Sequence, residues 1–61
     1  MKELFENHLN TYSSWRNEIK KTISVALFNK HGVFIKELKI PPHGNIIVPP
    51  NTTLKLISFI Q

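Results

Sequence analysis

The first 21 residues place apolar side chains at intervals of three and four positions. These side chains are Leu4, Phe5, Leu9, Tyr12, Trp15 and Ile19. This is the period of an amphipathic helix, so the pattern predicts a helical segment over residues 1–21. Positions 10–14 weaken it, because Asn, Thr and Ser side chains compete for backbone hydrogen bonds. The segment is either one helix over residues 2–21, which we favour, or two short helices with Ser13 or Ser14 capping the second.

From residue 22 onward the period changes to two, which is the period of β-strands. The alternation begins with Ile23, Val25 and Leu27. Strands are expected at 23–28, 33–40, 45–48 and 53–60, separated by breaks that are rich in Asn, Gly and Pro.

The breaks contain one pattern twice. Ile40-Pro41-Pro42 and Val48-Pro49-Pro50 each close an expected strand, and proline ends strands because it cannot donate to a ladder. The sequence therefore predicts an α+β fold in a single small domain, residues 1–61. An N-terminal amphipathic helix is followed, over residues 22–61, by a small four-stranded antiparallel meander sheet.

The last expected strand is apolar on both faces. Strict alternation places Leu54, Leu56 and Ile60 on one face, with Ile57 and Phe59 on the other. One helix covers only one face of a small sheet, so the chain is expected to expose a surplus of apolar surface. A contiguous patch of that kind usually marks an interface.

The size of the chain supports the same expectation. A chain of 61 residues buries only about 60% of its unfolded surface, and such domains usually rely on disulfides, metals or oligomerisation. Cysteine is absent, which excludes disulfides and thiolate metal sites. Self-association or docking on a larger protein is therefore expected to brace the fold.

The expected location is the cytoplasm, or a particle assembled in the cytoplasm. Glu3 and Glu6 stand where a signal peptide needs a basic flank and an apolar run. The longest apolar stretches, 25–28 and 46–48, are far shorter than the ~20 residues that span a bilayer. No membrane span is expected.

Catalytic chemistry is not indicated by any motif. His8, His31 and His43 are the candidates for acid–base chemistry, and their spacing is not that of metal ligands. Aspartate is absent, and Gly32 and Gly44 each close an expected turn rather than a phosphate-binding loop. We expect no enzyme, no catalytic residue, no metal, no cofactor and no small-molecule substrate.

The favoured hypothesis is a non-enzymatic assembly or interaction module. It would be a small subunit that self-associates or docks on a larger protein, for example as a virion component or a small inhibitor of a host enzyme. Strand addition at an open sheet edge is one concrete mechanism. The predicted interface residues are Phe34, Leu54, Leu56, Ile57 and Phe59.

The alternative hypothesis is a small basic nucleic-acid-binding protein. The net charge is +4, which favours an anionic partner, and aromatic side chains can stack on bases. The predicted contacts are Trp15, Arg16, Lys20, Lys21, Lys36 and Lys55. Glu18 and Glu37 interrupt this positive charge, so nucleic acid is the less favoured partner.

Overall fold

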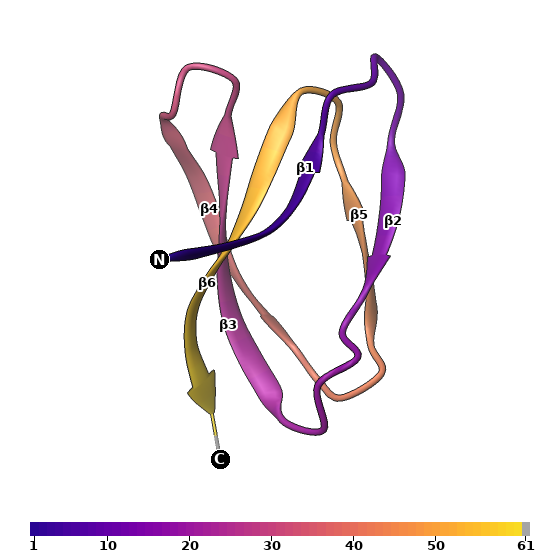
Figure 1. Ribbon diagram of the computed structural model, residues 1–61, viewed down its shortest axis with the longest axis vertical. Helices are drawn as coiled ribbons and strands as arrows, with labels where there is room; N and C mark the ends of the chain where they lie inside the picture. The colour runs from indigo at the N-terminus through magenta and orange to yellow at the C-terminus, as the bar shows by residue number, and fades with distance from the viewer. Residues whose placement is uncertain (61) are drawn as a thin grey trace.

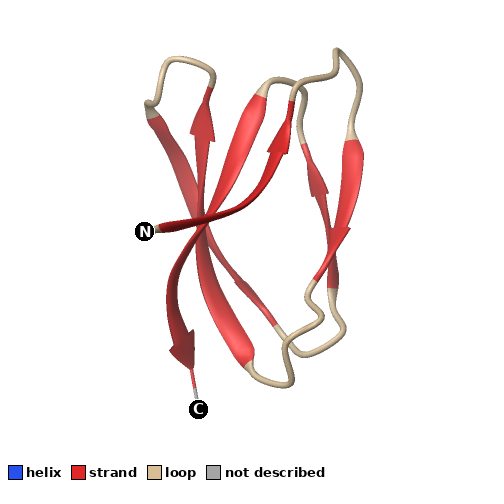
Figure 2. Cartoon of the chain, viewed as in Figure 1, coloured by secondary structure: helices blue, strands red, loops and turns tan. Residues whose placement is uncertain are grey.

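A computed structural model describes residues 1–60 as six β-strands in two antiparallel sheets (Figures 1 and 2). The strands are β1 (Lys2–Asn7), β2 (Ser13–Arg16), β3 (Thr22–Asn29), β4 (Phe34–Ile40), β5 (Asn45–Val48) and β6 (Thr52–Ile60). The larger sheet has the order β1-β6-β3-β4, and the smaller one pairs β2 with β5.

The topology is that of one long two-stranded ribbon folded twice. Along the ribbon, β1 pairs with β6, β2 with β5, and β3 with β4, all antiparallel. The first and last pairs lie side by side through β6 and β3 to form the four-stranded sheet. The middle pair, β2 with β5, forms the second layer at the right of Figure 1. The two places where the ribbon folds, which we call its corners, lie at opposite ends of the molecule.

The helix predicted over residues 1–21 is wrong, and so is the α+β fold class. Residues 1–60 contain no helix, and the N-terminal segment forms β1, a corner, β2 and the start of a second corner. The three-and-four spacing of apolar residues arises because Leu4 and Phe5 lie in a strand, whereas Leu9 and Ile19 lie in the corners. Asparagine side chains that bond to the local backbone favour such turns over helix.

The strands predicted after residue 22 are confirmed, but the meander is not. The β3–β4 hairpin and the short strand Asn45–Val48 form as expected. However, β5 leaves the sheet and pairs with β2, and β6 returns between β1 and β3. The alternating pattern predicts a strand and its faces, but it does not state which strand lies beside it.

The core lies between the two sheets. Its fully buried apolar side chains are Ile23, Val25, Leu27, Ile40, Val48 and Leu54. β3 supplies three of them at alternate positions, and the small side chains between them, Ser24 and Ala26, are buried on the other face of the sheet. Trp15 and Ile46 face each other across the β2–β5 pair and pack against this cluster. The β2–β5 layer therefore takes the place that the predicted helix was expected to fill.

The first corner is held by the buried side chain of Asn7, which is 2% exposed. Its Oδ1 accepts a hydrogen bond from the backbone N–H of Leu9 at 2.9 Å. The two hydrogens of its Nδ2 are shared among three carbonyl oxygens, those of Thr11 at 2.9 Å, Val48 at 3.1 Å and Pro49 at 3.1 Å. The Asn7 side chain thus stabilises the turn over residues 7–11 and connects that turn to the loop between β5 and β6.

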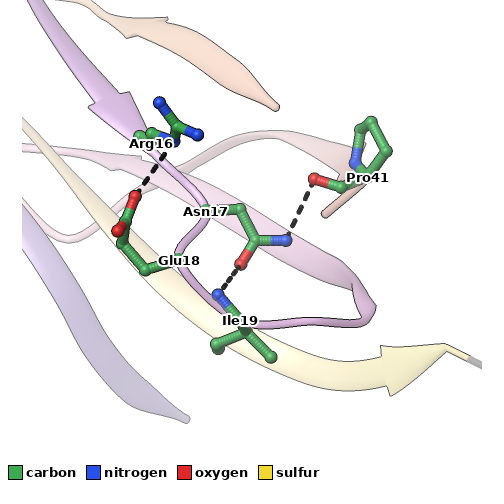
Figure 3. A network of polar contacts seen from close by, with 5 residues as sticks. All are labelled: Arg16, Asn17, Glu18, Ile19 and Pro41. Atoms are coloured by element: carbon green, nitrogen blue, oxygen red, sulfur yellow. Dashed lines mark hydrogen bonds and ion pairs between the residues drawn. The ribbon is translucent and has the colours of Figure 1, made fainter. Parts of the chain in front are cut away.

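The second corner repeats this arrangement with Asn17, which is 0% exposed (Figure 3). Its Oδ1 accepts from the N–H of Ile19 at 2.9 Å. The two hydrogens of its Nδ2 are shared among three carbonyl oxygens, those of Lys21 at 2.9 Å, Ile40 at 3.2 Å and Pro41 at 3.1 Å. Both corners therefore use an Asn-x-aliphatic loop clipped to an aliphatic-Pro-Pro loop, and we call each arrangement an asparagine clip.

The accepting loops are also alike in backbone conformation. His43 and Asn51, each two residues after the clipped proline, have φ values of 61° and 54°. A proline followed by a residue of positive φ is the pattern of a type II turn. In the second corner, Gly44 N–H donates to the Pro41 carbonyl at 2.9 Å.

Replacing Asn17 by alanine is expected to lower the free energy of unfolding by about 2–4 kcal/mol, because three carbonyls and one N–H lose a buried partner. Asn45→Ala, at an exposed position of β5, is the matched control and should change it by less than about 0.5 kcal/mol. Urea denaturation followed by the fluorescence of Trp15 measures both. Equal losses for the two variants would show that the Asn17 clip is not a stabilising element.

Candidate interaction surface

The five predicted interface residues occupy three different environments. Leu54 is fully buried and Leu56 is half-buried against the core. Phe34 is 55% exposed near the tip of the β3–β4 hairpin, where its ring packs edge-to-face on Phe28 with centroids 5.9 Å apart. Ile57 and Phe59 are 40% and 52% exposed at the far end of β6.

A β-bulge in β6 decides where Phe59 points. Opposite β3, Ser24 pairs with Ser58 and Val25 pairs with Leu56, so Ile57 is an extra residue. A bulge of this kind shifts the alternation by one. Phe59 is therefore the partner of Ile23 and lies on the core face of the sheet, together with Leu56. The sequence alternation had placed Phe59 on the opposite face from Leu56, and that assignment is wrong because of the bulge.

Three cross-strand rows with apolar side chains lie on the core face of the large sheet, next to a polar row of Asn29, Thr52 and Asn7. The first row runs from Lys36 through Leu27 and Leu54 to Phe5, and the second from Leu38 through Val25 and Leu56 to Lys2. The third row contains Ile40, Ile23 and Phe59. In the first and second rows, β1 supplies the last residue beside β6. In the third row, no strand within residues 1–60 occupies the equivalent position beside Phe59.

Within residues 1–60, the third row has no member from β1, which begins at Lys2. Pairing between β1 and β6 begins at Lys2 and Leu56. Residues 58–60 of β6 therefore pair only with β3, and Ile57 is the unpaired residue of the bulge. Figure 1 shows the N-terminal end of β1 and the C-terminal end of β6 turning away from each other. We call residues 57–60, with their unpaired backbone edge, the β6 end.

The predicted nucleic-acid contacts do not gather on one surface. Lys55 lies on the outer face of the large sheet, beside Ala26, with its Nζ 5.1 Å from the centre of the Phe28 ring. Lys36 is the partner of the core residue Leu27, on the opposite face of that sheet.

The other predicted contacts lie around the second corner. Arg16 pairs with Glu18 at 3.0 Å (Figure 3), and Trp15 packs against the core. Lys20 and Lys21 are exposed in the loop between β2 and β3.

A shallow polar hollow of about 240 Å³ lies near the first corner. It is lined by Glu6, Asn7, His8, Lys30, Asn51 and Thr53. His8 Nε2 lies 3.5 Å from Glu6 Oε1. Sequence reasoning missed this hollow, because it joins β1, the β3–β4 turn and the β5–β6 turn. Among the described residues, no three His, Asp or Glu side chains gather closely enough to hold a metal ion.

No protein-family model, curated protein or solved structure matches this chain. Within residues 1–60, the structure has no helix long and apolar enough to cross a membrane.

Phe59→Ser is expected to lower the free energy of unfolding by only about 1 kcal/mol, because half of the ring is already exposed to water. Leu54→Ala, in the same strand but in the core, should cost about 3 kcal/mol. Chemical denaturation of both variants tests the assignment of the β6 end to the surface. Similar losses for the two would mean that Phe59 is part of the folded core.

Proposed function

We propose that the protein is a non-enzymatic assembly module that associates with copies of itself or with a larger protein through the β6 end. The observation that supports this most strongly is the exposure of Ile57 and Phe59 on the only part of β6 that lacks a second neighbouring strand within residues 1–60. Exposed apolar side chains beside free backbone groups favour binding of another polypeptide.

The position of Phe59 strengthens the proposal. Its row already contains Ile23 and Ile40, which are 0% and 1% exposed. A partner that covers Phe59 would extend an existing core rather than cover an isolated side chain. Burial of apolar area is the main favourable term in protein association, so the largest gain is expected at this place.

The nucleic-acid alternative remains a prediction that no specific contact favours. Its six predicted residues are divided between two faces of the large sheet and the second corner. Arg16 is matched by Glu18, and Lys55 lies opposite Glu3 of the neighbouring strand. A phosphate backbone is bound best by cations that face it together.

The double variant Ile57→Ser with Phe59→Ser is expected to weaken association by more than about tenfold, because two apolar contacts are lost. Sedimentation velocity across a dilution series at moderate salt measures self-association. The matched control is Ile47→Ser, which removes a 59% exposed isoleucine from the outer face of β5 and should leave the mass distribution unchanged.

If the wild-type chain is a monomer at all concentrations, a photoreactive residue at position 59 tests docking on a larger protein in the cells that make it. Position 47 serves as the reference site. A monomer whose position 59 forms no adducts beyond those formed by position 47 would contradict the proposed function.

A further inference from the structure

The free edges of the sheets differ in how they are protected against pairing. Natural proteins protect edges with charged side chains, prolines or very short strands. β1 has Lys2, Glu3 and Glu6 along its edge, and β4 has Lys36, Glu37 and Lys39. β2 and β5 have only four residues each, and β5 is followed directly by proline.

The β6 end has none of these protections. Its sequence, Ile57-Ser58-Phe59-Ile60, contains neither charge nor proline, and β3 occupies only one side of it. Backbone N–H and C=O groups alternate along a strand edge, and the geometry that satisfies all of them is another strand. The occupant that fits this edge is therefore an extended polypeptide segment.

The incomplete third row indicates which kind of side chain the added segment needs beside Phe59. An added strand would place one residue beside Phe59 on the core face, in line with Ile23 and Ile40. The equivalent place in the first row is filled by Phe5, which packs against the core. An apolar residue at this position would complete the row, and its neighbours on the outer face would lie beside Ser58 and Ile60.

Lysine side chains lie near both ends of the β6 end, close to Leu56 and close to Ile60. Lys2 stands beside Leu56, where pairing with β1 stops. Lys20 and Lys21 are exposed at the other limit, directly before Thr22, which is the partner of Ile60. These side chains favour acidic residues at the two ends of an added strand. A second copy of this chain would instead bring its own lysines to the same edge, where like charges repel.

We propose that the β6 end binds an extended segment of another protein as an added strand, with an apolar residue beside Phe59 and acidic residues at its ends. This inference rests on the proposed function, because it names the partner of the same surface. It states three separate features of that partner, namely strand conformation, one apolar anchor and acidic flanks.

The probe is a capped eight-residue peptide with alternating threonine and valine at its four central positions and two glutamates at each end. One control peptide replaces the glutamates by lysines, and a second replaces a central valine by proline. Binding to the full chain is followed by the backbone amide signals in NMR titrations. Titrations are made at about 0.01 M salt, where the Debye length is about 30 Å, and at about 1 M, where it is about 3 Å.

The acidic peptide is expected to shift the amides of residues 57–60. At low salt it should bind about tenfold more tightly than the lysine peptide, and this difference should disappear at high salt. The proline peptide should not bind. Lys20→Glu with Lys21→Glu should reverse the preference between the two charged peptides. Lys30→Glu with Lys36→Glu, which changes the net charge equally on the β3–β4 side of the sheet, should not reverse it.

The inference is overturned if the acidic peptide leaves residues 57–60 unchanged, if it shifts other amides instead, or if the lysine peptide binds equally well at low salt. It is also overturned if these amides are already protected in a dimer without peptide, because a second copy then occupies the edge. In each case, the sedimentation and crosslinking results for Ile57 and Phe59 still decide the proposed function separately.

Discussion

The structure depends on two buried asparagine side chains. At each corner of the folded ribbon, Asn7 or Asn17 accepts one hydrogen bond through Oδ1 and shares its two Nδ2 hydrogens among three carbonyl oxygens. Two of those three carbonyls lie far away in the sequence. Proline suits the accepting loops, because it supplies a carbonyl oxygen but has no N–H that would need a partner. No buried side-chain nitrogen or oxygen within residues 1–60 lacks a hydrogen bond. Polar satisfaction at the corners therefore lets a small, cysteine-free chain keep one arrangement of its strands.

The same constraint creates the surface that we propose for binding. Because the clips fold the ribbon at two fixed places, the β2–β5 pair lies over the core face of the large sheet, and its Trp15, Ile46 and Val48 pack in the core. The β6 end extends beyond the pairing with β1, and the bulge at Ile57 turns Phe59 toward the core face. The apolar surface at the β6 end is thus the edge of the core itself, in contrast to the separate Phe28–Phe34 contact at the hairpin tip.

The sequence predicts the strands after residue 22, since alternation and proline breaks mark them directly. Of the five residues predicted for an interface, Phe34, Ile57 and Phe59 are exposed, whereas Leu54 is fully buried and Leu56 is half-buried. The N-terminal strands are not predicted from the sequence. Leu9 and Ile19 lie in the corners, but together with the apolar residues of β1 and β2 they have the three-and-four spacing that is typical of a helix. One signal in the sequence could have indicated the corners. The pattern Asn-x-aliphatic occurs twice, at residues 7–9 and 17–19, just as the aliphatic-Pro-Pro pattern occurs twice, at residues 40–42 and 48–50. The bulge at Ile57 leaves no mark in the alternating pattern, so the face of Phe59 could not be read from it.

The most direct test of the asparagine clips is hydrogen exchange of the asparagine side-chain amides, observed by NMR after transfer into deuterated water. We expect slow exchange for the Nδ2 hydrogens of Asn7 and Asn17, which are buried and hydrogen-bonded. The amide of Asn45, which is exposed on β5, should exchange at once. Equally fast exchange at all three positions would contradict the claim that the clips hold the folded ribbon together.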